Sequence, residues 1–254
     1  MDQSVYDKLT EVEDRHWWWR GRRDIIAAAI ERYAPRTSQR IRIAEVGCGS
    51  GGNLAMLSRF GDVLGAEAET TAINHLRRKQ GVHFDVVCHR VPDPLPRRYH
   101  VIGMFDVLEH IEDDAGAMKW AAEQLEPGGI AVLTVPAFQF LWTEQDEAAH
   151  HFRRYTLPDL LRVVAPSLSV EHVSYFNSLL FPPILAVRTA MRMTRRRDRP
   201  AKNHLGIPPE PLNWLLYQLF RLERHFVSRR RWAFGVSLLL VVRRQSSPAQ
   251  TSSA

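Results

Sequence analysis

The segment that most constrains the fold of this chain is Ile43–Gly52, which reads IAEVGCGSGG. A short apolar run ends in a carboxylate and passes directly into a glycine-rich turn. Leu54, Leu57 and Phe60 follow at the spacing of one helix face. This order predicts a buried strand, a tight loop and a helix N-terminus, the usual cradle for a nucleotide-like ligand. Glycine suits such a loop because a side chain there would occupy the space of the ligand.

The loop by itself is compatible with two ligands. Gly47, Gly49 and Gly52 satisfy the G-x-G-x-x-G pattern of dinucleotide-binding enzymes. Gly47, Gly49 and Gly51 equally satisfy the E/D-x-G-x-G-x-G pattern of enzymes that use S-adenosylmethionine (SAM). Features outside the loop have to separate the two.

Composition indicates a globular protein without a disulfide framework. The 254 residues are 45% hydrophobic and 24% charged, enough for one large α/β domain or a domain with an insertion. We expect the two cysteines, Cys48 and Cys88, to be free thiols. The N-terminus has no apolar signal segment, and the uncharged stretch Val173–Val187 is shorter than the roughly 18 to 20 apolar residues that span a bilayer. We therefore expect a cytoplasmic protein.

Charge is unevenly distributed along the chain. From Arg188 to Arg244 there are fourteen Lys and Arg against three Asp and Glu, a formal +11, which leaves −5 for the rest of the +6 total. This asymmetry predicts an acidic partner, namely an anionic membrane surface, a phosphate-bearing substrate or nucleic acid, although a solvated basic face would give the same pattern. A membrane partner would place the protein at the inner face of the membrane as a peripheral protein.

Strand-like and helix-like patterns alternate over the middle of the chain. Strands are expected at residues 41–45, 62–67, 82–88, 101–105 and 130–135, with helices at 53–60, 70–80 and 114–125. Such β-α repeats predict a parallel sheet covered by helices on both faces. Two further strands, at 168–176 and 234–243, enclose helical segments at 179–193 and 212–227 and a loop rich in Arg and Pro at 195–211.

These patterns divide the chain into five parts. The expected parts are an aromatic and basic helical cap (1–40), a ligand-binding core (41–177), a basic helical insertion or lid (178–233), a last core strand (234–244) and a disordered tail (245–254). The cap contains Trp17, Trp18 and Trp19. Because consecutive helical residues point about 100° apart, these three cannot all face one core. We expect at least one, with Trp18 as the candidate substrate contact, to lie at a pocket, an interface or a membrane surface.

Three features outside the glycine loop bear on the choice of ligand. Glu45 stands where dinucleotide enzymes usually have an apolar residue, and its carboxylate can receive the ammonium of a bound amino acid. Glu67 closes the second strand, where a carboxylate can accept both hydroxyls of a ribose, a feature that suits either ligand. The last feature is a pair of later motifs, Asp106–His110 (DVLEH) after the fourth strand and Leu125–Gly129 (LEPGG) before the fifth.

At these residues the chain resembles the class I SAM-dependent methyltransferases, over roughly residues 10–177 and the final strand. The resemblance implies a Rossmann-like α/β fold with a seven-stranded, mostly parallel sheet of order 3-2-1-4-5-7-6, whose last strand is antiparallel, and with helices on both faces. It also implies that Cys88–Val91 lies where the family contacts adenine, often through an Asp that this chain lacks. The cofactor-binding residues implied are Glu45, Gly47, Cys48, Gly49, Gly51, Glu67, Asp106 and Val107.

A narrower resemblance concerns residues 141–156, which contain the element His151-x-Arg153-Arg154-Tyr155. This stretch is similar to a bacterial subgroup of the family. A base is expected for an oxygen acceptor, and histidine is suited because its pKa lies near neutrality. The candidate catalytic residues are His110, His151 and Tyr155. Arg153 and Arg154 are either a surface ion-pair cluster or a clamp for an anionic group of the substrate.

The expected activity is transfer of a methyl group from SAM to an oxygen or carbon atom of a small-molecule or lipid-linked acceptor. The alternatives left open are a nicotinamide-dependent oxidoreductase and a non-catalytic SAM-binding partner. Nucleic acid is an unlikely substrate, since the Asn/Asp-Pro-Pro-Tyr/Phe/Trp motif of many amino-group methylators is missing. No metal is expected, although His150-His151 with Asp146 and Glu147 is a conceivable site. The sequence does not specify an oligomeric state.

Overall fold

The computed structural model describes residues 12–78, 84–193 and 206–245. These residues form a seven-stranded sheet of order β3-β2-β1-β4-β5-β7-β6, in which β7 is antiparallel to both of its neighbours and the other pairs are parallel. This confirms the strand order and the antiparallel last strand expected from the sequence. The strands are β1 (Ile41–Val46), β2 (Gly61–Glu67), β3 (Asp85–Cys88), β4 (Tyr99–Phe105), β5 (Leu125–Pro136), β6 (Leu168–Phe176) and β7 (Ser237–Arg244).

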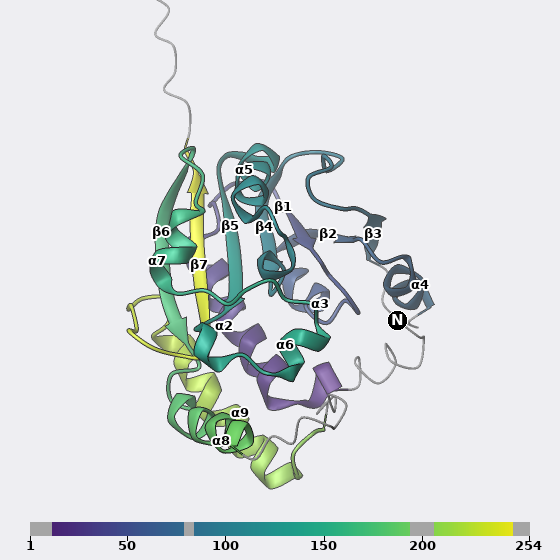
Figure 1. The fold of residues 1–254 in the computed structure, drawn as a ribbon. Helices are drawn as coiled ribbons and strands as arrows, with labels where there is room; N and C mark the ends of the chain where they lie inside the picture. Colours follow the sequence, from purple (N-terminus) through teal and green to yellow (C-terminus); the bar gives the residue numbers. More distant parts are fainter. Residues whose placement is uncertain (1–11, 79–83, 194–205, 246–254) are drawn as a thin grey trace, which may run out of the picture.

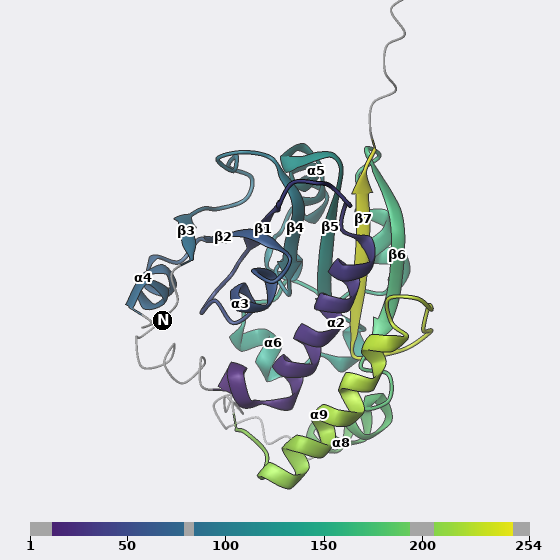
Figure 2. The same ribbon diagram turned by 180° about the vertical axis from the view of Figure 1, so that it is seen from behind.

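Helices cover both faces of this sheet (Figures 1 and 2). One face packs against α5 (Asp114–Gln124) and α7 (Leu157–Arg162), and the other packs against α2 (Trp17–Tyr33), α3 (Leu54–Leu57) and α9 (Glu210–Leu222). Adjacent strand residues point to opposite faces, so both sides of the central strands are buried and apolar. The remaining helices are α4 (Thr70–Arg78), α6 (Glu144–Ala148), α8 (Phe181–Met193) and the short 3-10 turns η1 (Leu108–His110), η2 (Gln139–Leu141) and η3 (Glu223–His225).

Helix α2 lies beside α9 across the back of the sheet, as Figure 2 shows. Gly21 of α2 allows this close approach, because a Cβ atom there would overlap the Phe220 ring of α9. The insertion between β6 and β7 is thereby fixed to the N-terminal helix. Asn213 of α9 strengthens the contact, since its side-chain oxygen accepts the Trp17 N–H at 2.9 Å.

Several element boundaries differ from the expected ones. The helix expected at 53–60 is a single turn, Leu54–Leu57. Strand β5 begins at Leu125 instead of residue 130, because Leu125 pairs with Tyr99 before the Glu126–Gly129 turn loops out and pairing resumes at Ile130. The helix expected at 212–227 ends at Leu222 and continues as η3.

The expected tail at 246–254 and most of the expected loop at 195–211 lie outside the described residues. Within the described residues, no helix combines the length and apolar character needed to cross a membrane.

Candidate functional site

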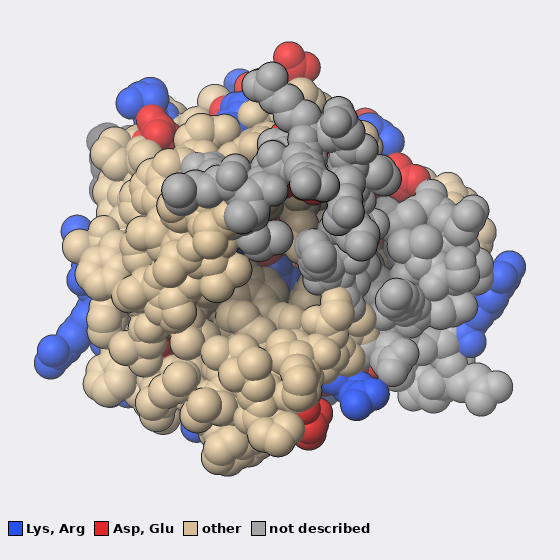
Figure 3. All heavy atoms as spheres, turned by 60° about the horizontal axis from the view of Figure 1, so that its bottom comes forward, with Lys and Arg blue, Asp and Glu red and all other residues tan. Residues whose placement is uncertain are grey.

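The candidate site lies where the carboxyl ends of β1, β2 and β4 meet. These three strands are neighbours in the sheet, and Glu45 of β1 pairs with Gly65 of β2 and Gly103 of β4. The loops that follow parallel strands emerge at one edge, where α/β proteins bind ligands. Figure 3 views the molecule from this side and shows a hollow there, with basic atoms visible in its depth.

The glycine loop adopts the backbone that its sequence requires. Gly47, Gly49 and Gly51 have φ angles of 69°, 52° and 79°, a region that side-chain-bearing residues rarely adopt. A Cβ atom at Gly47 would lie 2.6 Å from Val107 Cγ2, so Gly47 lets the ends of β1 and β4 approach. A Cβ atom at Gly49 would meet no protein atom within 4 Å. The loop is therefore open at Gly49, as expected where a ligand must come close to the backbone.

The Glu67 carboxylate stabilises this loop through hydrogen bonds from backbone N–H groups. Its Oε2 atom accepts the Gly49 N–H at 2.8 Å, and its Oε1 atom accepts the Glu69 N–H at 2.9 Å. Each carboxylate oxygen has two lone pairs, so both retain capacity for a ribose hydroxyl. The position at the end of β2 thus fits the ribose-binding role that the family resemblance implies.

Glu45 is a buried carboxyl group with one unsatisfied oxygen. Its side chain is 1% exposed, Oε1 accepts the Asn53 amide N–H at 2.7 Å, and Oε2 has no hydrogen-bond partner. Burial raises its pKa to about 8. An orphaned buried oxygen of this kind fits the ammonium group of SAM, which would supply both a donor and a compensating positive charge.

Asp106 is paired with Arg22 of α2, a residue that the sequence patterns do not place at the site. The two side chains form an ion pair, and the Thr134 hydroxyl donates to Asp106 Oδ1 at 3.0 Å. Asp106 has a φ of 56°, so the chain turns sharply directly after β4. The N-terminal helix therefore closes one side of the candidate cofactor site, which the spacing of Arg22 in the sequence does not reveal.

Two other expected cofactor contacts lie nearby. Cys48 is a free, buried thiol whose pKa is raised by burial. The stretch Cys88–Val91, where the family resemblance places the adenine, contains His89. Its Nε2 hydrogen-bonds to the Asp93 carbonyl oxygen at 2.7 Å, and its buried Nδ1 has no hydrogen-bond partner.

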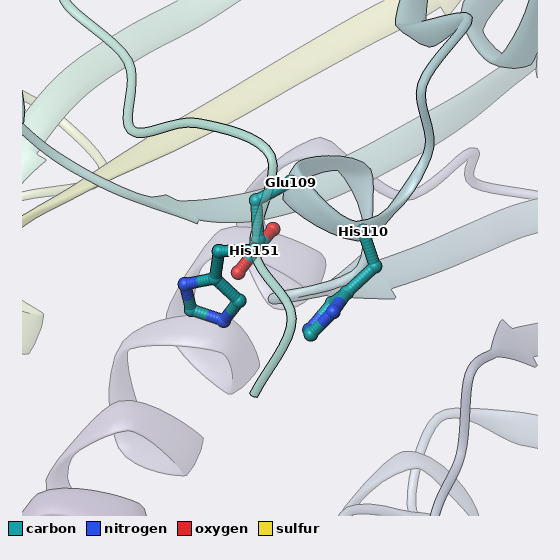
Figure 4. A group of neighbouring side chains, drawn as sticks. All are labelled: Glu109, His110 and His151. Atoms are coloured by element: carbon teal, nitrogen blue, oxygen red, sulfur yellow. The ribbon is translucent and has the colours of Figure 1, made fainter. Parts of the chain in front are cut away.

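A second polar group lies on the turn that follows Asp106. Glu109 is fully buried, and neither of its carboxylate oxygens has a hydrogen-bond partner. Burial raises the pKa of Glu109 well above its ordinary value. The rings of His110 and His151 stand edge to face, with centroids 4.6 Å apart, and the Glu109 carboxylate lies close to both (Figure 4). The sequence predicts the two histidines as candidate catalytic residues, but it does not single out Glu109.

His151 is held by a buried carboxylate. Asp146 Oδ1 lies 2.9 Å from His151 Nδ1, and Asp146 is 1% exposed. Arg154 clamps the same carboxylate through Nε at 2.8 Å and through a second nitrogen at 2.9 Å. The Thr143 N–H also donates to Asp146, so the two residues form the capping box of α6, with Thr143 as the N-cap. These bonds fix the His151 ring in one orientation.

The structure gives Arg153, Arg154 and Tyr155 internal partners. Arg153 pairs with Asp114 at 2.7 Å, and the Tyr155 hydroxyl donates to the same Asp114 carboxylate at 2.9 Å. Arg154 is engaged by Asp146 as described. Tyr155 is 1% exposed, and burial raises its pKa. The arrangement matches the ion-pair alternative for the two arginines. A role of Arg153 or Arg154 in binding the substrate stays a prediction.

Trp18, the candidate substrate contact, is half-buried and has aromatic partners inside the molecule. Its ring stacks on Phe220 at 5.4 Å and on Phe176 at 6.4 Å, and it packs against the core on the α2 side of the sheet. Trp17 joins the same cluster through an edge contact with Phe220. Trp19 instead contacts His16 edge to face. Two of the three tryptophans thus complete the core between α2 and α9.

Comparison with known proteins agrees with this geometry. A family described as "Methyltransferase domain" matches residues 18–179. The chain is 31% identical over 179 residues to the Ubiquinone biosynthesis O-methyltransferase of Cereibacter sphaeroides, covering 63% of this chain and 72% of that protein. It is 24% identical over 163 residues to the protein of the same name from Idiomarina loihiensis, covering 56% and 66%. The match spans about two thirds of the length of these relatives.

A solved structure shares the fold over nearly the whole chain. It is a chain in the complex between the Haloferax volcanii Trm112 methyltransferase activator and a methyltransferase. The TM-score is 0.60 at 16% identity, with 96% of each chain covered. Since the family match covers more than half of the residues, the chain belongs to the methyltransferase-domain family and is a SAM-dependent methyltransferase of Rossmann-like fold.

Proposed function

We propose that this enzyme methylates a hydroxyl oxygen of a small-molecule or lipid-linked acceptor. The observation that carries the proposal is the position of the Asp146–His151 pair and His110, next to Asp106 at the end of β4. In the family resemblance, Asp106 and Val107 lie beside the sulfonium of SAM. The curated relatives, which are named O-methyltransferases, support the same acceptor atom.

The cofactor supplies a methyl group on a positively charged sulfur, which is already activated for displacement. The residues of the chain bind and orient it: Glu45 toward the ammonium, Glu67 toward the ribose, and the loop around Gly49 along the amino-acid part. Alignment of donor and acceptor accounts for most of the rate acceleration that such a reaction needs.

Methyl transfer from SAM to a hydroxyl group releases one proton. The acceptor loses its hydroxyl proton, its oxygen forms a bond to the methyl carbon, and the carbon–sulfur bond breaks with its electron pair going to sulfur. The products are a methyl ether, S-adenosylhomocysteine (SAH) and one proton. A group that takes the proton is therefore required at the acceptor oxygen, whereas a strongly nucleophilic carbon has less need of one.

His151 is suited to take this proton. Asp146 binds its Nδ1 side, which leaves Nε2 as the nitrogen that faces away from the carboxylate. The partner carboxylate orients the ring and stabilises its charged form, as in other His–Asp pairs. His110 is the neighbouring imidazole, and its pKa is lowered by burial and by the proximity of His151. Of these two imidazoles, His151 is the one that forms a hydrogen bond with a carboxylate in the part of the chain that the structure describes.

An exposed apolar surface around α8 and α9 supports a lipid-linked acceptor. Leu212, Trp214 and Leu215 at the start of α9 are 47%, 57% and 47% exposed, and α8 has no buried side chain among its described residues. Both helices lie at the end of the molecule to which the carboxyl ends of the parallel strands point (Figure 1). In Figure 3 few charged side chains interrupt the described surface around the hollow. Such a surface matches an apolar acceptor or a membrane.

The acceptor class is tested by incubating the protein with methyl-labelled SAM and a cell extract that is then partitioned. Label should enter the lipid phase as an alkali-stable ether. His151→Asn should abolish incorporation, whereas His150→Asn, a change at an exposed neighbour with a φ of 58° that Asn tolerates, should not. Labelled product from His151→Asn at the wild-type rate would refute the proposed role of His151. SAH binding without incorporation into any fraction would favour a non-catalytic SAM-binding protein.

Membrane contact has its own test. The protein should co-sediment with vesicles that contain anionic phospholipid at low salt and less so with neutral vesicles, because both charge and apolar area contribute. Trp214→Ala should weaken this binding. Equal recovery in the supernatant with and without vesicles would leave only a small-molecule acceptor.

A further inference from the structure

We propose that Glu109, His110 and His151 form a binding site for one divalent transition-metal ion. Each of these residues offers a ligand atom, and the three atoms lie within 4.8 Å of one another. Glu109 and His110 come from η1, and His151 comes from the segment that follows α6 (Figure 4). Ligands about 2.0–2.2 Å from an ion lie roughly 3 Å apart, so small side-chain rotations close the site.

The buried carboxylate of Glu109 is the first observation behind this inference. It has 0% exposure and no hydrogen bond to either oxygen, an arrangement that costs free energy unless something compensates it. The charged residues that act on it are Asp106, Arg22 and Arg154. Both arginines are already paired, with Asp106 and Asp146 respectively. A cation bound to Glu109 would satisfy the unpartnered oxygens.

The second observation is the support behind the His151 imidazole. Histidines that bind metals almost always donate their other ring N–H to a carboxylate or a backbone carbonyl. His151 has Asp146 at 2.9 Å on Nδ1, so its Nε2 is the nitrogen left for an ion. Arg154 donates two hydrogen bonds to Asp146, so the carboxylate that orients His151 is itself fixed.

The ligand chemistry selects the kind of ion. Two imidazoles and one carboxylate suit Zn²⁺, Co²⁺, Fe²⁺ or Mn²⁺ better than Mg²⁺ or Ca²⁺, which prefer oxygen ligands. Three protein ligands leave at least one coordination position open. Glu109 and His110 lie three and four residues after Asp106 in the chain.

What the ion does in catalysis rests on the proposed function, although its binding does not. A divalent cation lowers the pKa of a hydroxyl group that it contacts, so the acceptor proton would leave to water. The two imidazoles would then be ligands, and His151 would not itself accept the proton. The metal-bound and metal-free enzymes thus predict different roles for the same residue, which the experiment below separates.

The test titrates protein that has been treated with a chelator and dialysed. Zn²⁺ is followed by calorimetry and Co²⁺ by visible absorption, where a site with imidazole ligands gives d–d bands. We expect one ion per chain. Glu109→Gln keeps the size of the side chain and should weaken Zn²⁺ binding at least tenfold, as should His151→Asn. His150→Asn is the matched control and should bind Zn²⁺ like the wild type. SAH binding by each variant reports whether it is folded.

The results are unambiguous in both directions. Tight binding lost with Glu109→Gln but retained with His150→Asn, in proteins that all bind SAH, establishes the site. Equal Zn²⁺ affinity in wild type and Glu109→Gln, or no Co²⁺ spectrum in a protein that binds SAH, overturns it. Methyl transfer that persists in excess chelator would overturn the catalytic role of the ion while the methyltransferase assignment stands. An ion that binds in a protein without any methyl transfer would instead refute the proposed function alone.

Discussion

The placement of the cofactor is tested by two alanine substitutions with matched backbone strain. Gly49 and Gly128 have φ angles of 52° and 78°, and a Cβ atom at either position meets no atom within 4 Å. An alanine at such a φ costs about 1–2 kcal/mol. For a chain of this size, that cost lowers the melting temperature by about 2–8 °C. The two variants should therefore lose similar amounts of stability.

They should differ in SAH binding. Gly49 lies at the carboxyl edge of β1, where the open space is assigned to the cofactor, whereas Gly128 lies in the turn near the start of β5, at the opposite edge of the sheet. A methyl group that overlaps the ligand should weaken SAH at least about 30-fold, or about 2 kcal/mol. Gly128→Ala should leave the dissociation constant unchanged.

Thermal unfolding with and without SAH measures both effects. At a SAH concentration 100 times the wild-type dissociation constant, binding stabilises the native state by about 2.7 kcal/mol. A 30-fold weaker Gly49→Ala variant should gain only about 0.9 kcal/mol under the same conditions, while Gly128→Ala gains the full amount. If SAH stabilised the two variants equally, the assignment of the open space at Gly49 to the cofactor would be wrong.

Three other substitutions test separate parts of the structure. As the pH rises from 5 to 8, Glu45→Gln should gain stability relative to the wild type, by as much as about 4 kcal/mol, because the wild-type carboxyl ionises in the unfolded state whereas its raised pKa of about 8 keeps it protonated in the folded state. Urea unfolding of both proteins at both pH values should show that their difference in unfolding free energy grows with pH, and a constant difference would contradict the raised pKa. Gly21→Ala should destabilise the protein by about 1–3 kcal/mol, since the new methyl group overlaps Phe220, and an unchanged melting temperature would mean that α2 and α9 are not packed as described. Arg154→Lys retains the charge but cannot bind both Asp146 oxygens, so it should cost about 1.5–3 kcal/mol while SAH affinity stays the same; a stability equal to wild type would argue against the bidentate pair.

The strands and their parallel arrangement could be predicted from the sequence because their determinants are local, whereas the strand order followed from the family resemblance. Each parallel strand is a short apolar run that ends at a recognisable residue, as β1 does before Gly47 and β2 at Glu67, and a helical pattern follows. The boundaries could not be predicted as well. The β5 extension to Leu125 depends on pairing with Tyr99, a partner 26 residues earlier, and local propensity carries no information on that pairing.

The polar cluster was predicted only in part, for a similar reason. The spacing of Glu45, Gly49 and Glu67 follows from the β-α repeat, so these residues could be assigned together. Glu109 and His151 are 42 residues apart and meet only because the segment after β5 folds back over η1. One bond of that return is the Phe152 N–H, which donates to the Glu109 carbonyl oxygen at 2.8 Å. A contact of this kind cannot be read from periodicity.

The return of this segment also explains the His-x-Arg-Arg-Tyr element as a device for positioning one ring. Arg154 grips Asp146, Asp146 orients His151, and Tyr155 and Arg153 both anchor on Asp114 at the start of α5. Arg154 thus holds His151 through Asp146, while Arg153 and Tyr155 anchor the same segment to α5. The element therefore keeps the His151 imidazole close to the Glu109 carboxylate.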